Sequence, residues 1–130
     1  MTRILIVDPH DLVCMALETR LRTAVGLEVV GSTNDYTEAP HKAGQLQPDV
    51  ILLETKAPQG LSTLDVLCQK LPQCAIIVLT SYADSHEEDQ TRRHGAARYL
   101  LKTLNTKELV QEIRAVAREK QPTVLASADE

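Results

Sequence analysis

The sequence predicts an α/β fold in which five parallel strands alternate with five helices. Three observations lead to this expectation. Five short apolar runs recur along the 130-residue chain, helical patterns separate them, and each run is continuously apolar. Alternating strands and helices are typical of βα crossover units, and continuously apolar strands are typical of a sheet that helices cover on both faces. We expect one domain over residues 1–119, followed by a linker or tail over residues 120–130.

The five predicted strands are apolar runs bounded by polar or turn residues. The first run is followed by Asp8, the second by Gly31 and the third by Glu54. The fourth is followed by Thr80 and the fifth by Lys102. The predicted strands cover residues 4–7, 27–30, 50–53, 75–79 and 99–101.

Two helices are predicted in the first half of the chain. Val13, Leu17 and Leu21 recur at the spacing of one face of an amphipathic helix. A weaker helix is expected at about residues 37–46, where Pro40 is compatible only with the first turn.

The third and the last helices have clearer signals. Ser62 and Asp65 have the spacing of a capping box for the third helix, which Pro72 ends. Thr106 is expected to cap the last helix. Their apolar faces consist of Leu64, Leu67 and Leu71 in the third helix and Leu109, Ile113 and Val116 in the last.

The fourth predicted helix, at residues 85–94, contains no large apolar residue, and Gly95 follows it. Two acid-first pairs at i,i+4 spacing, Glu88–Arg92 and Asp89–Arg93, support it by about 0.2–0.5 kcal/mol each. We expect a poorly anchored helix with a solvated face, or a surface adapted to a particular partner.

Composition excludes several classes of protein. The formal net charge of −4 argues against direct nucleic-acid binding by this domain. No apolar run approaches the length of a membrane span, and the N-terminus lacks the pattern of a signal peptide. The three cysteines indicate neither a metal cluster nor a disulfide framework, which favours a cytoplasmic location.

Polar side chains follow four of the predicted strands. Asp8, Glu54 and Lys102 come directly after the first, third and fifth strands, and Thr80 and Ser81 after the fourth. In open α/β sheets, ligands bind at the carboxyl ends of the strands. If the strand order is 2-1-3-4-5, two carboxylates, a hydroxyl and an ammonium group converge there.

These residues lie within runs that resemble a receiver domain of bacterial two-component systems, of the NarL/LuxR type. The resemblance extends from residue 3 to about residue 116. It implies a flavodoxin-like (βα)5 fold, a doubly wound sheet of order 2-1-3-4-5. The similar runs are ILIVD at 4–8, EVVG at 28–31, PDVILL at 48–53, KAP at 56–58, VLTS at 78–81 and GAARYLLK at 95–102.

The resemblance implies a site and a switch. In receiver domains, acidic residues after the first and third strands bind Mg²⁺, and the aspartate after the third accepts a phosphoryl group. A lysine neutralises the phosphoryl charge, a hydroxyl binds the group, and an aromatic residue turns inward. These positions are Asp8, Glu54, Lys102, Thr80 and Tyr99 here, so Thr80 and Tyr99 are the expected switch residues.

Two positions depart from the family pattern. Pro9 takes the second acidic position and has no side-chain oxygen for a metal. Glu54 takes the phospho-acceptor position, and a misplacement of about 1 Å can cost on the order of a hundredfold in rate. We therefore expect a degenerate site without catalytic residues, metal or other cofactor, in which Asp8, Pro9, Thr80 and Lys102 are remnants.

The retained residues suggest a metal-free arrangement. Lys102 can pair directly with Glu54, and Thr80 can donate to the same carboxylate. Such a pair either imitates the phosphorylated state or holds the site shut, and the sequence leaves both open.

The leading hypothesis is a non-enzymatic regulatory module of a response regulator that works without phosphorylation. Its partner is expected to be an effector or DNA-binding domain of the same protein, or a separate protein. Two alternatives remain: a conventional Mg²⁺-dependent receiver that uses Glu54, and a flavodoxin-like nucleotide or flavin binder. No Gly-rich phosphate loop follows the first strand to support the last of these.

The resemblance also suggests a surface for self-association. NarL/LuxR-type receivers pair through their first and last helices. We expect a weak or moderate homodimer through these helices, with Cys14 and Met15 on the first and Val110 and Ala117 on the last at the contact.

Overall fold

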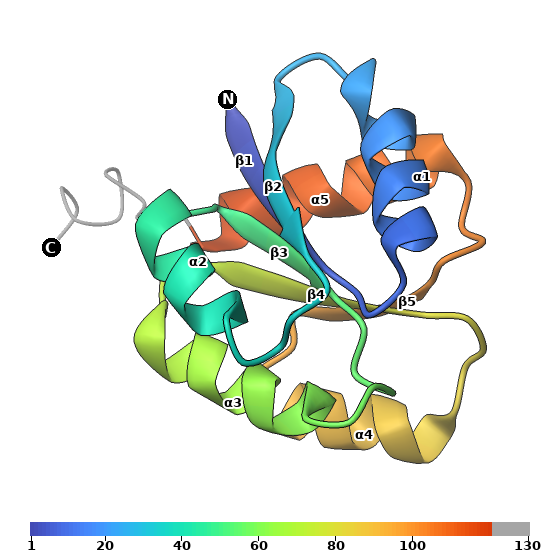
Figure 1. Cartoon of the computed structure of the whole chain (residues 1–130). Helices are drawn as coiled ribbons and strands as arrows, with labels where there is room; N and C mark the ends of the chain where they lie inside the picture. The colour runs from blue at the N-terminus through green and yellow to red at the C-terminus, as the bar shows by residue number, and fades with distance from the viewer. Residues whose placement is uncertain (121–130) are drawn as a thin grey trace, which may run out of the picture.

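The computed structural model describes residues 1–120 as an open parallel sheet with helices on both faces (Figure 1). The strand order is β2-β1-β3-β4-β5, and every neighbouring pair is parallel. The predicted fold class is therefore confirmed. Of the linker or tail expected at residues 120–130, only Lys120 is described, as the last residue of a helix, and residues 121–130 lie outside the described residues. The strands are β1 (Thr2–Val7), β2 (Leu27–Thr33), β3 (Val50–Leu53), β4 (Ala75–Thr80) and β5 (Arg98–Leu101). The helices are α1 (Asp11–Arg22), α2 (Ala39–Leu46), α3 (Gly60–Lys70), α4 (Ser85–Arg93) and α5 (Thr106–Lys120).

The sheet separates two apolar cores, because successive residues of a strand point to opposite faces. Ile4 and Ile6 of β1 pack with α1 and α5 on one face, whereas Leu5 and Val7 pack with α2 and α3 on the other. Each fully buried aliphatic side chain stabilises the fold by about 1.5–3 kcal/mol. Figure 1 shows α1 and α5 on one side of the sheet and α2, α3 and α4 on the other.

Two predicted helix caps are wrong, because the side chains expected to cap these helices bind other groups. Ser62 and Asp65 form no capping box: α3 begins at Gly60, and Asp65 pairs with His94 at the end of α4. Gly60 lies against the backbone of Thr55, where a Cβ atom would come within 2.3 Å of the carbonyl oxygen. At α5, Asn105 rather than Thr106 accepts the capping hydrogen bond, from the N–H of Glu108.

The polar helix α4 forms as predicted. Asp84 caps it by accepting a hydrogen bond from the N–H of His86. Both predicted i,i+4 pairs are confirmed, with nitrogen–oxygen distances of 3.1 Å for Arg92–Glu88 and 3.0 Å for Arg93–Asp89. The only buried residue of α4 is Thr91, so polar contacts must attach this helix to the domain.

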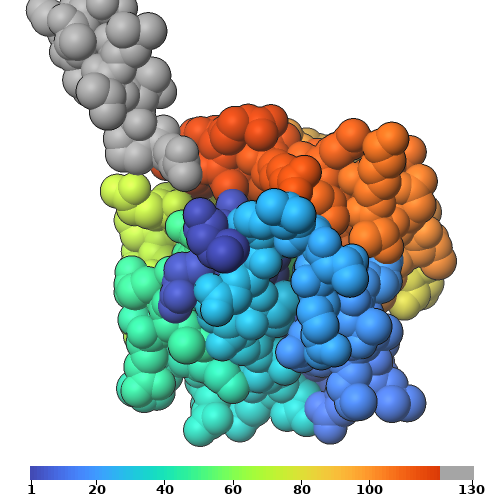
Figure 2. Space-filling view, turned by 90° about the horizontal axis from the view of Figure 1, so that it is seen from above, coloured from blue at the N-terminus to red at the C-terminus, as the bar shows by residue number. Residues whose placement is uncertain are grey.

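The helices α1 and α5 lie side by side at the surface (Figure 2). The apolar residues expected to form a contact there are mostly in the core: Cys14, Val110 and Ala117 are all buried against the sheet. Met15, at 62% exposure, is on the surface as predicted, together with Leu12 at 79%. The prediction was wrong for the other three because their helix face covers the sheet. None of the helices within residues 1–120 is long and apolar enough to cross a membrane.

Candidate functional site

Three charged side chains meet at the carboxyl edge of the sheet. Asp8 follows β1, Glu54 follows β3 and Lys102 follows β5, so the parallel strands place all three at this edge. The Lys102 Nζ atom lies 2.7 Å from Asp8 Oδ2 and 2.8 Å from Glu54 Oε1. Both carboxylates are buried, and the Lys102 side chain is only 13% exposed. The direct Lys102–Glu54 pair expected from the sequence is present, and Asp8 joins it.

The four carboxylate oxygens of this cluster all have protein donors. Besides Lys102, Asp8 accepts from the backbone N–H of His10 at 2.9 Å through Oδ1. Glu54 accepts from the backbone N–H of Lys56 at 2.7 Å through Oε2. Within residues 1–120, every buried side-chain nitrogen or oxygen has a hydrogen-bond partner. The cluster is therefore satisfied by the protein alone.

The charge of Lys102 is stabilised by this arrangement. Burial lowers the pKa of its ammonium group, but the hydrogen bonds and charges of Asp8 and Glu54 raise it more, so that the pKa lies above its ordinary value. An opposite charge at this distance favours the charged form of an amine. Lys102 is thus held as an ammonium ion between two carboxylates.

The residues at this edge do not fit the Mg²⁺ ion of conventional receivers. Magnesium needs oxygen ligands in near-octahedral geometry. Pro9 supplies no side-chain oxygen, and the oxygens of Asp8 and Glu54 already accept hydrogen bonds. In the described part of the chain, no group of three or more His, Cys, Asp or Glu residues is placed to hold a metal ion.

A second polar cluster lies beside the first, around the side chain of Lys56. Its Nζ atom is 2.5 Å from Thr80 Oγ1 and 2.5 Å from Glu87 Oε1 of α4. It also donates to the backbone oxygen of Tyr82 at 3.0 Å and lies 4.2 Å from the centre of the Tyr82 ring. Burial lowers the pKa of Lys56, but Glu87 raises it more, to above its ordinary value.

Thr80 lies in this second cluster and not in the first. Sequence reasoning expected its hydroxyl to donate to Glu54, and this was wrong. The hydroxyl donates instead to the Tyr82 carbonyl at 2.9 Å and accepts from Lys56. A hydroxyl has one hydrogen to donate, and the carbonyl two residues later in the turn takes it.

The predicted switch residue Tyr99 is buried, at 9% exposure, with its hydroxyl between β5 and the start of α4. The hydroxyl donates to Glu87 Oε1 at 2.5 Å and accepts from the backbone N–H of Asp84 at 3.1 Å. Burial and then the Glu87 hydrogen bond raise the pKa of this phenol. Tyr99 therefore contacts the second cluster through Glu87.

Sequence reasoning missed four residues that support the two clusters: Lys56, Glu87, Tyr36 and Arg20. Tyr36 is buried and donates to the backbone oxygen of Glu54 at 2.6 Å. Arg20 of α1 donates to the backbone oxygens of Lys102, at 2.9 Å, and Leu104. Only Lys56 carried a usable signal, because it lies two residues after Glu54; the others approach from distant elements.

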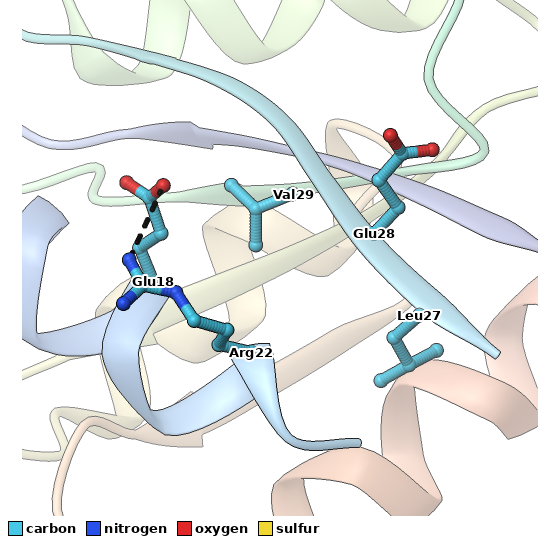
Figure 3. A pocket seen from close by; sticks show the side chains of 5 residues that line it. All are labelled: Glu18, Arg22, Leu27, Glu28 and Val29. Atoms are coloured by element: carbon cyan, nitrogen blue, oxygen red, sulfur yellow. Dashed lines mark ion pairs between the residues drawn. The ribbon is translucent and has the colours of Figure 1, made fainter. Parts of the chain in front are cut away.

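A separate hollow of about 200 Å³ lies between α1 and the edge strand β2 (Figure 3). It is lined by the first residues of β2, so it lies away from the carboxyl ends of the strands. Figure 3 shows Glu18 and Arg22 from α1 facing Val29, with an ion pair of 3.9 Å between the first two. It contains none of the predicted site residues, so it does not belong to the candidate site.

Comparison with known proteins agrees with the fold. Residues 4–114 match the family described as the response regulator receiver domain. The transcriptional regulatory protein LiaR of Bacillus subtilis is 35% identical over 120 residues, 91% of this chain and 57% of that protein. The response regulator GacA of Pseudomonas viridiflava is 35% identical over 118 residues, 89% of this chain and 55% of that protein. This chain thus spans little more than half the length of these relatives.

Solved structures of response regulators have the same fold as this chain. A LuxR-family two-component response regulator from Aurantimonas sp. SI85-9A1 superposes with a TM-score of 0.84 and 25% identity, over 100% of this chain and 95% of that one. The response regulator domain of Thermotoga maritima CheB gives a TM-score of 0.81 and 26% identity, over 91% and 97%. The chain therefore belongs to the response regulator receiver domain family.

Proposed function

We propose that this receiver domain signals without phosphorylation of Glu54 and without Mg²⁺, through contact with another domain or protein. One observation carries the proposal: the Lys102 ammonium group lies between the buried carboxylates of Asp8 and Glu54, within 2.8 Å of an oxygen of each. The protein itself supplies the positive charge that a conventional receiver obtains partly from a metal. The domain then has a regulatory role and no reaction of its own.

The cost of opening this cluster supports the proposal. Each Glu54 oxygen accepts a hydrogen bond in this cluster, one from Lys102 and one from the N–H of Lys56, so a reaction that separates Glu54 from Lys102 breaks a buried ion pair. Removing one partner from a buried ion pair typically costs about 3–5 kcal/mol. A Mg²⁺ ion would have to displace Lys102 from Asp8 and would find Pro9 where a further ligand is needed.

The experiment is incubation with acetyl phosphate and Mg²⁺, followed by intact mass measurement. We expect no gain of a phosphoryl group under conditions that fully modify a conventional aspartate-containing receiver. A mass increase that disappears in the Glu54→Gln variant, but persists in the control Glu88→Gln, would contradict the proposal. That result would favour the alternative in which Glu54 accepts phosphate. The family match gives no support to a flavin-binding function.

The partner of this domain is proposed to be a DNA-binding effector domain or a separate regulatory protein. The named relatives include a transcriptional regulatory protein, and the match to this chain covers only 57% and 55% of their lengths. With a net charge of −4, this domain is itself unsuited to binding nucleic acid. A regulator of transcription would therefore contact DNA through a different part of the protein.

Self-association through α1 and α5 is a further part of the proposal. It is supported by exposed Leu12 and Met15 and by a mostly apolar groove of about 360 Å³ along α1, lined in part by Leu12, Ala16 and Leu17. Sedimentation should show a weak dimer that Met15→Glu dissociates, whereas Gln90→Glu, an exposed position on α4, should leave it intact. A monomeric parent at high micromolar concentration would contradict this part alone.

A further inference from the structure

Helix α4 raises the question of what attaches it to the domain. Its sequence, SHEEDQTRR, contains no apolar side chain, and its only buried residue is Thr91. A helix that is polar all round needs specific polar contacts to hold a fixed position. His94, just after the helix, pairs with Asp65 of α3, so the carboxyl end of α4 is attached there.

The amino-terminal half of α4 is attached through Glu87. This side chain is only 14% exposed although it is charged. It accepts from three side chains of other elements: Lys56 at 2.5 Å, the Tyr99 hydroxyl at 2.5 Å and the Thr55 hydroxyl at 3.4 Å. Two of these donors come from the loop after β3, and the third comes from β5.

Lys56 makes hydrogen bonds to both clusters. Its backbone N–H donates to Glu54, whereas its side chain extends to Thr80 and Glu87. The Thr80 hydroxyl, by contrast, makes no hydrogen bond to Glu54 and donates to Tyr82. Lys56 therefore connects the site at residue 54 with helix α4, through its backbone at one end and its side chain at the other.

We propose that Lys56 and Glu87 form a permanent clamp that fixes the first turns of α4 and the buried position of Tyr99, independently of any reaction at Glu54. In this clamp, two residues outside the cluster of Asp8, Glu54 and Lys102 have a positioning role. It makes the α4–β5 surface available in one conformation at all times. A ligand or partner changes this surface only if it separates Lys56 from Glu87.

The clamp can be tested by amide hydrogen exchange and by NMR of ring-labelled tyrosine in the full chain. The variants are Lys56→Met and the isosteric Glu87→Gln, with Lys107→Met and Glu88→Gln as controls for loss of a surface charge. In each test variant we expect at least tenfold faster exchange at the amides of residues 88–90 and a shifted Tyr99 ring signal. The double variant should exchange no faster than the faster single variant, because both changes break the same contact.

Two results would overturn the clamp. One is exchange within threefold of the parent at residues 88–90 in both test variants. The other is an equal acceleration in α4 and α5, which would indicate general destabilisation. If Lys56→Met does not fold, Glu87→Gln alone decides, because it retains the size of the side chain while it removes the negative charge and one acceptor oxygen. Phosphorylation of Glu54 would contradict the proposed function and leave the clamp standing, so the two proposals fail separately.

Discussion

Glu54 and Lys102, 48 positions apart in the chain, form a buried ion pair with an oxygen–nitrogen distance of 2.8 Å. The same ammonium group binds Asp8, so two carboxylates from different strands share one positive charge. The cluster is closed by protein contacts and leaves no carboxylate oxygen without a donor. Such a site is suited to holding the edge of the sheet in a fixed state.

Replacing Lys102 should destabilise the domain strongly. The Lys102→Met variant leaves the buried carboxylates of Asp8 and Glu54 without their shared counter-charge. We expect a loss of about 3–5 kcal/mol in the free energy of unfolding, measured in urea at neutral pH. Lys107→Met, at an exposed position, should change it by less than about 0.5 kcal/mol. A loss for Lys102→Met no greater than that of the control would contradict the buried-pair account.

Gly60 is expected to tolerate no side chain. A Cβ atom there would lie 2.3 Å from the Thr55 carbonyl oxygen, a backbone atom that cannot move without shifting the loop that carries Lys56. Gly60→Ala should therefore destabilise the domain by about 1–3 kcal/mol or more. In Gly44→Ala, within α2, the nearest atom is the flexible end of Lys70, and the helix should gain up to about 1 kcal/mol. Thermal unfolding of both variants would show whether the two changes differ in sign.

Stability should fall at alkaline pH, in part through Cys74. Burial and the nearby negative charges of Asp49 and Cys68 raise the pKa of this thiol to about 12. In the unfolded chain the thiol loses its proton at its ordinary, lower pKa, so the unfolded state binds fewer protons between about pH 9 and 12. The contribution of the protonated thiol to the free energy of unfolding is therefore fully present below this pH range. It is lost as the pH rises through the range, by at most about 1.4 kcal/mol per pH unit.

The Cys74→Ala variant separates this contribution from those of other groups. Burial also raises the pKa values of Cys14 and Tyr36, so some alkaline loss should remain. We expect a shallower fall in unfolding free energy with pH for Cys74→Ala than for the parent. Ile76→Val, a buried change without a titrating group, should lower stability but keep the parent slope. Equal slopes for Cys74→Ala and the parent would show that this thiol does not contribute.

Placing aspartates at positions 9 and 54, where this chain differs from the family pattern, should create a Mg²⁺-binding site. In Pro9→Asp with Glu54→Asp, the shorter carboxylate moves away from Lys102 and a new acid supplies a further oxygen ligand. We expect calorimetry to detect at least weak Mg²⁺ binding by this double variant and none by Pro9→Ala with Glu54→Gln. If the double variant binds Mg²⁺ no better than the parent does, other residues of the site have also diverged.

The sequence by itself determined the architecture and the composition of the main cluster. The continuous apolar runs and the turn residues are local signals, and they are sufficient for five strands, five helices and a parallel sheet. Asp8, Glu54 and Lys102 could be identified because each directly follows a strand, and parallel strands end at the same edge. The polar helix α4 was also predictable, together with its two i,i+4 pairs.

Only the tertiary structure decided which side chains bind one another. Lys56 and Glu87 are 31 positions apart, and their contact depends on the path of one loop and the placement of one helix. Thr80 donates to the carbonyl oxygen of Tyr82 and not to Glu54. Cys14, Val110 and Ala117 are buried because their helices pack with that face on the sheet. Local sequence patterns specify which elements form, whereas the partners of long flexible side chains depend on the distances between elements, and packing sets those distances.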